Sequence, residues 1–351
     1  MRLSLISVAL FSSLLCLGGC QSDGDTTQNP EEEVRFAGGA EDVTLVGTLS
    51  FPSEAGRFPG VLLISDSGPS DRNESIGGLQ PFQVLADALN AQGYAVLRHD
   101  DRGVGESSGD FASATVDDFA ADAIAGLNFL AADPRIRSDC LVMIGHSEGG
   151  YIAPIAAAGY SSAALVLLAG AAQTMPEIVL DQQLHLAYPD RDSDQIISLF
   201  SAINDIVRWG EDYLEMGRQI DGLLAGAGLD EQDRQFYVSM FASPWWKRYL
   251  EHDPAYWLQR LDRPVLALYG DKDVQVRAEP NAALMSAYLT SPLSRVETFA
   301  GLNHLFQEAV TGMPEEYLEL PGEVFDPVRM LPVMFEWLKS VLPDGCAKTQ
   351  G

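Results

Sequence analysis

Residues 141–150 read LVMIGHSEGG, and this stretch decides the fold of the chain. The apolar run 141–144 is typical of a buried strand, and the small residues after Ser147 begin a helix pattern. A chain that turns from strand to helix within one residue forces that residue into a strained conformation, and glycines two positions before and after it relieve the crowding. The pattern predicts a Ser147 hydroxyl held out of the sheet, beside the backbone amide of Glu148. The alternative is a Gly-rich turn that has no catalytic role.

Around this stretch, apolar strand-like runs alternate with segments of helical period. The runs are 43–51, 60–65, 95–98, 140–144, 164–168, 265–269 and 295–299. Helical patterns fall at 82–89, at 115–130 behind a capping box, and at 328–342. The alternation predicts the α/β class, with a mostly parallel sheet flanked by helices on both faces. We place this core at residues 34–172 and 262–345.

Residues 173–261 break the alternation, because helical spacing continues there without a convincing strand. The segment therefore reads as a helical insertion. It enters at the carboxyl end of a parallel strand, which is where loops border the site of such sheets. We expect it to form a lid over a pocket; a helical subdomain that only packs against the sheet is the alternative.

A nucleophilic serine needs a base, and the base needs a carboxylate that orients it. After the predicted strand 265–269, Asp273 is the expected acid, whereas Asp271 reads as a turn residue. An Asx turn is the alternative for Asp273. His304 follows the strand 295–299 in a loop before the last helix and is the expected base. The chain order Ser, Asp, His is that of α/β-hydrolases.

The other four histidines fit this role less well. His146 lies inside the 145–150 turn and is expected to pack beneath it, and His99 reads as part of a structural turn. His185 and His252 belong to the insertion. A second amide for an oxyanion is expected from the loop after the run 60–65, at the backbone of Ser67. An ordinary Ser-Gly-Pro turn is the alternative there.

Four motifs together resemble those of secreted or lipid-anchored bacterial carboxylesterases of the α/β-hydrolase superfamily. They are SGPSDR at 67–72, DDRGVG at 100–105, GHSEGG at 145–150 and NHLFQ at 303–307. The resemblance implies a serine hydrolase acting on a small-molecule carboxylic ester without a cofactor. Asp66 departs from it, since such chains usually carry Gly there. A carboxylate beside the oxyanion loop is expected to turn away.

The resemblance does not fix the substrate. A serine peptidase or another acyl hydrolase on the same fold is the nearest alternative, and a non-catalytic surface lipoprotein that binds a ligand is a second one. The sequence leaves the oligomeric state open.

The N-terminus predicts export. Residues 1–19 carry Arg2 and then an apolar stretch too short for a membrane span, as in a signal peptide. The stretch ends before Cys20 in a pattern that resembles a bacterial lipobox, which implies lipid attachment at Cys20. A plain signal peptide cut elsewhere is the alternative. Residues 20–33 read as a flexible tether. By resemblance, Gln21 favours the outer membrane in a Gram-negative host, so the membrane is reached by a lipid anchor only.

The composition of the chain argues against some classes of binding partner. The chain has 351 residues, 46% of them hydrophobic, which is ample for a large core, and a formal net charge of −28. Such acidity repels phosphate backbones, so nucleic-acid binding is not expected. No spacing of His and Cys indicates a metal site.

Two cysteines are left once Cys16 departs with the signal and Cys20 is assigned to lipid. Cys140 opens the strand before Ser147, and Cys346 lies just past the last helix. Strand starts and helix ends meet at the edge of a parallel sheet that is remote from the site. We therefore hypothesise a disulfide between Cys140 and Cys346. Two unrelated cysteines are the alternative.

Overall fold

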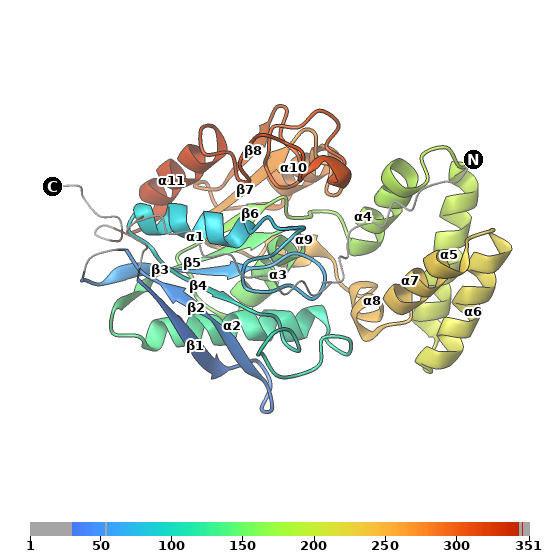
Figure 1. The fold of residues 1–351 in the computed structure, drawn as a ribbon, viewed down its shortest axis with the longest axis horizontal. Coiled ribbons are helices and arrows are strands. Elements are labelled where there is room, and N and C mark those ends of the chain that lie inside the picture. Colours follow the sequence, from blue (N-terminus) through green and yellow to red (C-terminus); the bar gives the residue numbers. More distant parts are fainter. Residues whose placement is uncertain (1–29, 53–54, 344–345, 347–351) are drawn as a thin grey trace.

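The structure is a computed structural model that describes residues 30–52, 55–343 and 346 (Figure 1). Its centre is an eight-stranded sheet in the order β1-β2-β4-β3-β5-β6-β7-β8. The pairs β1–β2 and β2–β4 are antiparallel, and every other pair is parallel. The strands are β1 (Glu31–Ala37), β2 (Thr44–Ser50), β3 (Phe58–Ile64), β4 (Ala95–His99), β5 (Ile136–His146), β6 (Ala164–Leu168), β7 (Val265–Gly270) and β8 (Arg295–Phe299).

Helices cover both faces of the sheet. One face packs against α1 (Pro81–Ala91) and α11 (Met330–Val341), and the other against α2 (Val116–Ala132), α3 (Glu148–Gly159) and α10 (Ala278–Tyr288). Successive strand residues belong to opposite clusters, since side chains alternate across a sheet. Both clusters are apolar, which explains the uninterrupted apolar runs of the central strands. The predicted mostly parallel sheet flanked by helices is confirmed.

Strand β1 is the element that the sequence pattern missed. It begins at Glu31, so the last three residues of the expected 20–33 tether are part of the sheet. Its first three residues are exposed glutamates and only Val34 and Phe36 are buried. Charged side chains are typical of an edge strand, where they discourage pairing with other chains, but they hide the strand pattern. Residues 1–29, with the expected signal segment and Cys20, lie outside the described residues.

The segment 173–261 is helical, as its spacing predicted. It holds α4 (Met175–Gln182), a π-helical turn η1 (Gln183–Ala187), α5 (Ser193–Trp209), α6 (Tyr213–Gly226), α7 (Glu231–Phe241), α8 (Pro244–Tyr249) and α9 (Pro254–Leu258). Figure 1 shows α5, α6 and α7 as a group set to one side of the sheet. The only other helical element described is a short 3₁₀ turn at Pro314–Glu316. No helix in the described ranges is long and apolar enough to cross a membrane.

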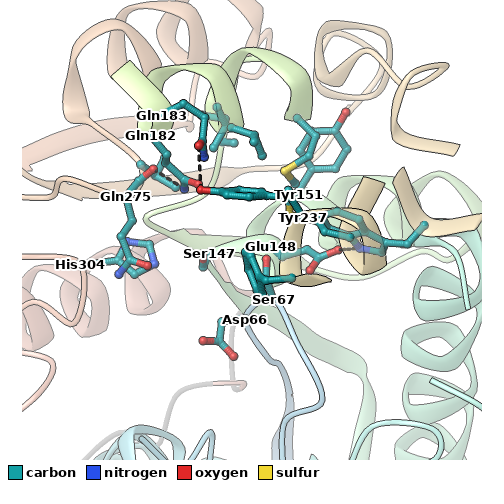
Figure 2. Close-up of a pocket in the computed structure, with 18 residues that line it drawn as sticks. Asp66, Ser67, Ser147, Glu148, Tyr151, Gln182, Gln183, Tyr237, Gln275 and His304 are labelled. Atoms are coloured by element: carbon teal, nitrogen blue, oxygen red, sulfur yellow. Dashed lines mark hydrogen bonds between the residues drawn. The ribbon is translucent and has the colours of Figure 1, made fainter. Parts of the chain in front are cut away.

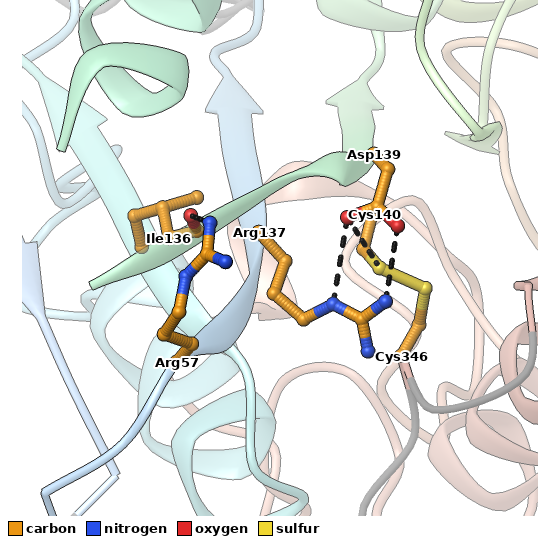
Figure 3. Close-up of a disulfide and its surroundings, with 6 residues drawn as sticks. All are labelled: Arg57, Ile136, Arg137, Asp139, Cys140 and Cys346. Atoms are coloured by element: carbon orange, nitrogen blue, oxygen red, sulfur yellow. Dashed lines mark hydrogen bonds and ion pairs between the residues drawn. A yellow bond between two sulfur atoms is a disulfide. The ribbon is translucent and has the colours of Figure 1, made fainter. Parts of the chain in front are cut away.

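A disulfide joins Cys140 to Cys346, with Cα atoms 5.8 Å apart (Figure 3). Strand β5 starts at Ile136, four residues before the predicted start at Cys140. The pairing of β3 with β5 shifts register after Pro59, so residues 138–140 are left out of the ladder. Cys140 lies seven residues before Ser147. Along an extended strand this spacing puts the disulfide about 20 Å from Ser147.

Candidate active site

Ser147 occupies the sharp turn between β5 and α3, with φ 52° and ψ −115°. A non-glycine residue with positive φ is strained and persists only where the surroundings impose it. The flanking glycines make the turn possible. A Cβ on Gly145 would lie 2.1 Å from the backbone oxygen of Gly149, and a Cβ on Gly149 would lie 2.1 Å from that of Ile64. The turn therefore requires glycine at both positions.

His304 and Asp273 form a buried pair in the loops after β8 and β7. His304 Nδ1 lies 2.7 Å from Asp273 Oδ2. The other carboxylate oxygen of Asp273 accepts hydrogen bonds from the backbone amides of Gln275 (2.8 Å) and Val276 (2.9 Å). With its position fixed in this way, the carboxylate holds the proton of His304 on Nδ1 and leaves Nε2 as the basic nitrogen.

Asp271 behaves as the turn residue that its position predicted. Its exposed carboxylate accepts a hydrogen bond from the backbone amide of Gly301 at 2.6 Å. It therefore stabilises the loop that leads to His304 without contacting the imidazole.

One cavity brings together Ser147, His304, Ser67 and Glu148 (Figure 2). It encloses about 790 Å³, part of it open to solvent, and none of the other described histidines lines it. The insertion supplies apolar wall residues, namely Met175, Ile178, Val179, Phe236, Met240 and Trp245. Among the described residues, no hydrogen bond links the Ser147 hydroxyl to His304. Such contacts are often loose before substrate binds.

The expected oxyanion amides border this cavity. Glu148 is the first residue of α3, so its N–H has no partner within the helix. Ser67 lies in the loop after β3 and lines the same cavity. The sequence assigned only backbone roles to both residues, but their side chains also meet. The Ser67 hydroxyl helps to lower the pKa of the Glu148 carboxyl group.

The Glu148 carboxylate is buried and has further partners in α8. Its Oε1 accepts hydrogen bonds from Trp245 Nε1 and from the Tyr249 hydroxyl, each at 2.7 Å. Burial raises the pKa of Glu148, and these donors oppose that rise. The carboxylate therefore ties the turn after Ser147 to the insertion. No sequence signal revealed this link, because the partners lie 97 and 101 residues away.

His146 packs beneath the turn, where the sequence placed it, but it also carries charge. Its Nδ1 lies 2.6 Å from Glu74 Oε1, and its Nε2 lies 3.0 Å from the backbone oxygen of His304. Burial alone would lower the pKa of His146, but the Glu74 carboxylate raises it to about 9. Both ring nitrogens then donate. Since Glu74 Oε1 also accepts from the Asp66 amide at 3.1 Å, this pair joins the His304 loop to the loop after β3.

The 67–72 and 100–105 motifs hold the loop after β3 in place. The Arg72 guanidinium binds Asp100 through two contacts, Nε to Oδ1 at 3.0 Å and Nη2 to Oδ2 at 2.7 Å. Asp101 accepts hydrogen bonds from the Ser65 hydroxyl and the Ser70 amide, each at 3.0 Å. The role of these motifs in the structure is thus to fix the segment that carries Ser67.

Asp66 lines the cavity, and Figure 2 shows its carboxyl group directed away from Ser147 and His304. Its Oδ1 accepts a 2.7 Å hydrogen bond from the Ser70 hydroxyl. Desolvation and the nearby charge of Glu74 raise the pKa of Asp66 to about 8. The carboxyl group is therefore mostly protonated at pH 7, which is how an acid is tolerated beside an oxyanion site.

No group of three or more His, Cys, Asp or Glu side chains that could hold a metal ion occurs in the described part of the chain.

Comparisons with known proteins agree on the fold. The family model described as "Serine aminopeptidase, S33" matches residues 73–190, which include Ser147 but end before Asp273. Esterase EstD of Thermotoga maritima is 25% identical over 283 residues, which are 80% of this chain and 63% of that protein. The match thus spans less than two thirds of the relative's length.

Solved structures cover nearly the whole chain. The α/β hydrolase GrgF from Penicillium sp. sh18 superposes with a TM-score of 0.57 at 16% identity, covering 89% of this chain and 99% of that one. An esterase from Pyrococcus furiosus gives a TM-score of 0.55 at 16% identity, covering 92% and 97%. Together with the mostly parallel eight-stranded sheet, these similarities establish that the chain has the α/β-hydrolase fold.

Proposed function

We propose that the protein is a serine hydrolase that cleaves carboxylic esters through Ser147, His304 and Asp273. The observation that carries the proposal is the buried His304–Asp273 pair, 2.7 Å apart, at a cavity into which the strained turn of Ser147 opens. A binding protein gains nothing from holding these three groups together. The similarity to an esterase over 80% of the chain supports the same reaction class.

The geometry supports a two-step reaction. Ser147 Oγ attacks the ester carbonyl carbon while His304 Nε2 takes the hydroxyl proton, and Asp273 stabilises the imidazolium. The amides of Glu148 and Ser67 stabilise the tetrahedral oxyanion. Collapse of this intermediate breaks the bond to the alcohol oxygen, which leaves with the proton from His304. Water then attacks the acyl-enzyme by the same route and releases the carboxylic acid.

The lining of the cavity favours esters over peptides with a free amino terminus. An aminopeptidase needs a carboxylate that faces the substrate's ammonium group. Two carboxyl side chains line this cavity, and neither fits that need. Glu148 is occupied by two donors from α8, and Asp66 is mostly neutral at pH 7. The remaining wall is mainly apolar.

A single set of assays tests this function. Wild-type protein is expected to hydrolyse p-nitrophenyl esters and to react with a fluorophosphonate probe, whereas Ser147→Ala is expected to lose at least about a thousandfold in turnover and all labelling. A parallel panel of peptide amides tests the alternative substrate class. Wild-type protein that neither labels nor turns over any ester would refute the proposal, and faster cleavage of amides than esters would replace it with a peptidase.

We further propose that residues 173–261 act as a lid. Helices α4, α7 and α8 supply walls of the cavity that contains Ser147. Exchanging residues 190–235 for a short linker is expected to change the preference among acyl lengths. If only the melting temperature changes, the lid role is wrong.

The cellular location stays a proposal as well: export with lipid attachment at Cys20. A disulfide between Cys140 and Cys346 is consistent with an oxidising compartment. Expression in a bacterial host with labelled palmitate tests it, since Cys20→Ser is expected to lose the label and appear in the soluble fraction. A variant that stays labelled and membrane-bound would contradict lipid attachment.

A further inference from the structure

The helical insertion contains a second cavity, distinct from the one that holds Ser147. It encloses about 400 Å³, part of it open to solvent. Its wall is largely apolar and includes Ile196, Leu199, Phe200, Leu224, Leu229 and Phe241. The lining is almost wholly apolar although the space is partly open to solvent. Pockets that bind apolar groups have such a lining, so this space suits an apolar ligand.

Gln183 and Tyr237 line both this cavity and the catalytic one. The Tyr237 hydroxyl donates a 2.9 Å hydrogen bond to Gln183 Oε1 (Figure 2). Gln183 opens the π-helical turn η1, a distortion that is frequent at functional sites. The hydrogen-bonded side chains of Tyr237 and Gln183 thus lie between two apolar spaces.

We propose that the cavity within the insertion receives the aliphatic chain of an ester substrate, and that Tyr237 and Gln183 are the partition through which the chain passes. The proposal rests on ester hydrolysis at Ser147, and it assigns medium- to long-chain aliphatic esters as the substrate class. Rotation of the Tyr237 side chain would open the partition at the expense of its bond to Gln183.

For an aliphatic chain that reaches past the partition, the affinity gained by burying methylenes exceeds the affinity lost by breaking the Tyr237–Gln183 bond. Burying one methylene strengthens binding by about fourfold. Breaking one neutral hydrogen bond weakens it by roughly fivefold. Two methylenes beyond the partition, about sixteenfold together, therefore outweigh the lost bond. Short esters gain nothing from opening and remain in the catalytic cavity.

The test compares kcat/KM for p-nitrophenyl decanoate and butyrate. Leu199→Trp fills the insertion cavity and is expected to lower the decanoate-to-butyrate ratio at least tenfold. Its matched control, Ile197→Trp, changes a residue of the same helix that is 44% exposed and is expected to leave the ratio within twofold. Tyr237→Phe, which lacks the closing hydroxyl, is expected to raise the ratio about fivefold. Thermal unfolding checks that each variant folds. If Leu199→Trp does not fold, Leu199→Phe is used in its place.

The outcomes distinguish a failure of the chain-binding cavity from a failure of the proposed ester hydrolysis on which it rests. If wild-type protein hydrolyses butyrate and labels with fluorophosphonate, but Leu199→Trp leaves the chain-length preference unchanged for both the acyl series and the alkyl acetates described next, only the chain-binding cavity is overturned. Wild-type protein that does neither overturns the esterase function. A parallel series of alkyl acetates shows which side of the ester enters the cavity: the series in which Leu199→Trp changes the chain-length preference identifies it as acyl or alkyl. No change in either series rejects the proposal.

Discussion

The buried carboxylate of Glu148 accepts a 2.7 Å hydrogen bond from the hydroxyl of Tyr249, which joins the residue after Ser147 to helix α8. Trp245 donates to the same oxygen, so one carboxylate holds the insertion against the core. Hydrogen bonds to charged groups are strong where water is excluded, and losing one leaves a buried charge poorly compensated. The position of α8 and the geometry of the oxyanion site are therefore energetically linked.

Tyr249→Phe is expected to lower the free energy of unfolding by about 1–3 kcal/mol, because it removes a donor from a buried carboxylate. Urea unfolding measures this change. Tyr256→Phe is the matched control, since the Tyr256 side chain lies on α9 with 51% exposed. Equal effects of the two substitutions would show that the Glu148–Tyr249 bond contributes nothing particular to stability.

Asp273→Asn is expected to reduce kcat by about 10⁴-fold, since an amide partner leaves the His304 proton on the wrong nitrogen. Asp271→Asn keeps an acceptor for the Gly301 amide and should change kcat by less than about tenfold. Steady-state hydrolysis of p-nitrophenyl butyrate compares the two. The opposite ranking would transfer the role of the acid to Asp271.

Stability should fall as pH rises above neutrality. The folded-state pKa of His146 is about 9, against an ordinary value of 6.5 for a histidine. A raised pKa stabilises the fold fully below the unfolded value, and the contribution is lost as pH rises from 6.5 through about 9. Its size is at most about 3 kcal/mol. Urea unfolding near pH 6 and near pH 9 measures the loss.

His146→Gln isolates the source of this pH dependence, because glutamine does not titrate. Asp66, with its pKa raised to about 8, also favours the fold at lower pH, so some slope should persist in the variant. Wild-type protein and His146→Gln with the same slope above neutrality would mean that the His146–Glu74 pair is not charged.

Replacing both bonded cysteines, Cys140→Ser with Cys346→Ser, is expected to destabilise the fold without slowing catalysis. The bond closes a loop with a sequence separation of 206, for which the chain-entropy model gives at most about 5 kcal/mol. The bond lies about 20 Å from Ser147 along β5. Urea unfolding and butyrate hydrolysis at 25 °C measure the two quantities. Slower hydrolysis by a fully folded double variant would contradict the expectation that the disulfide does not affect catalysis.

Local patterns in the sequence predicted much of the core. The turn at Ser147 is encoded by its two glycines and by the adjacent strand and helix, all within about a dozen residues. Asp273 and His304 could be placed because each follows a recognisable strand, and the structure brings them together across 31 residues. Strand β1 escaped because an edge strand buries only one face, and its three glutamates read as part of a tether.

The sequence by itself therefore determined the order of the strands from β2 onward, the strained serine and the candidate acid and base, because each depends on residues that are neighbours in the chain. Only the tertiary structure decided what surrounds them. The bond from His146 to the His304 backbone spans 158 residues, and the bonds from Glu148 to α8 span about a hundred. The cavity inside the insertion exists only because α5, α6 and α7 pack around it. Burial and charge pairing arise when distant segments meet, and no local period encodes that meeting.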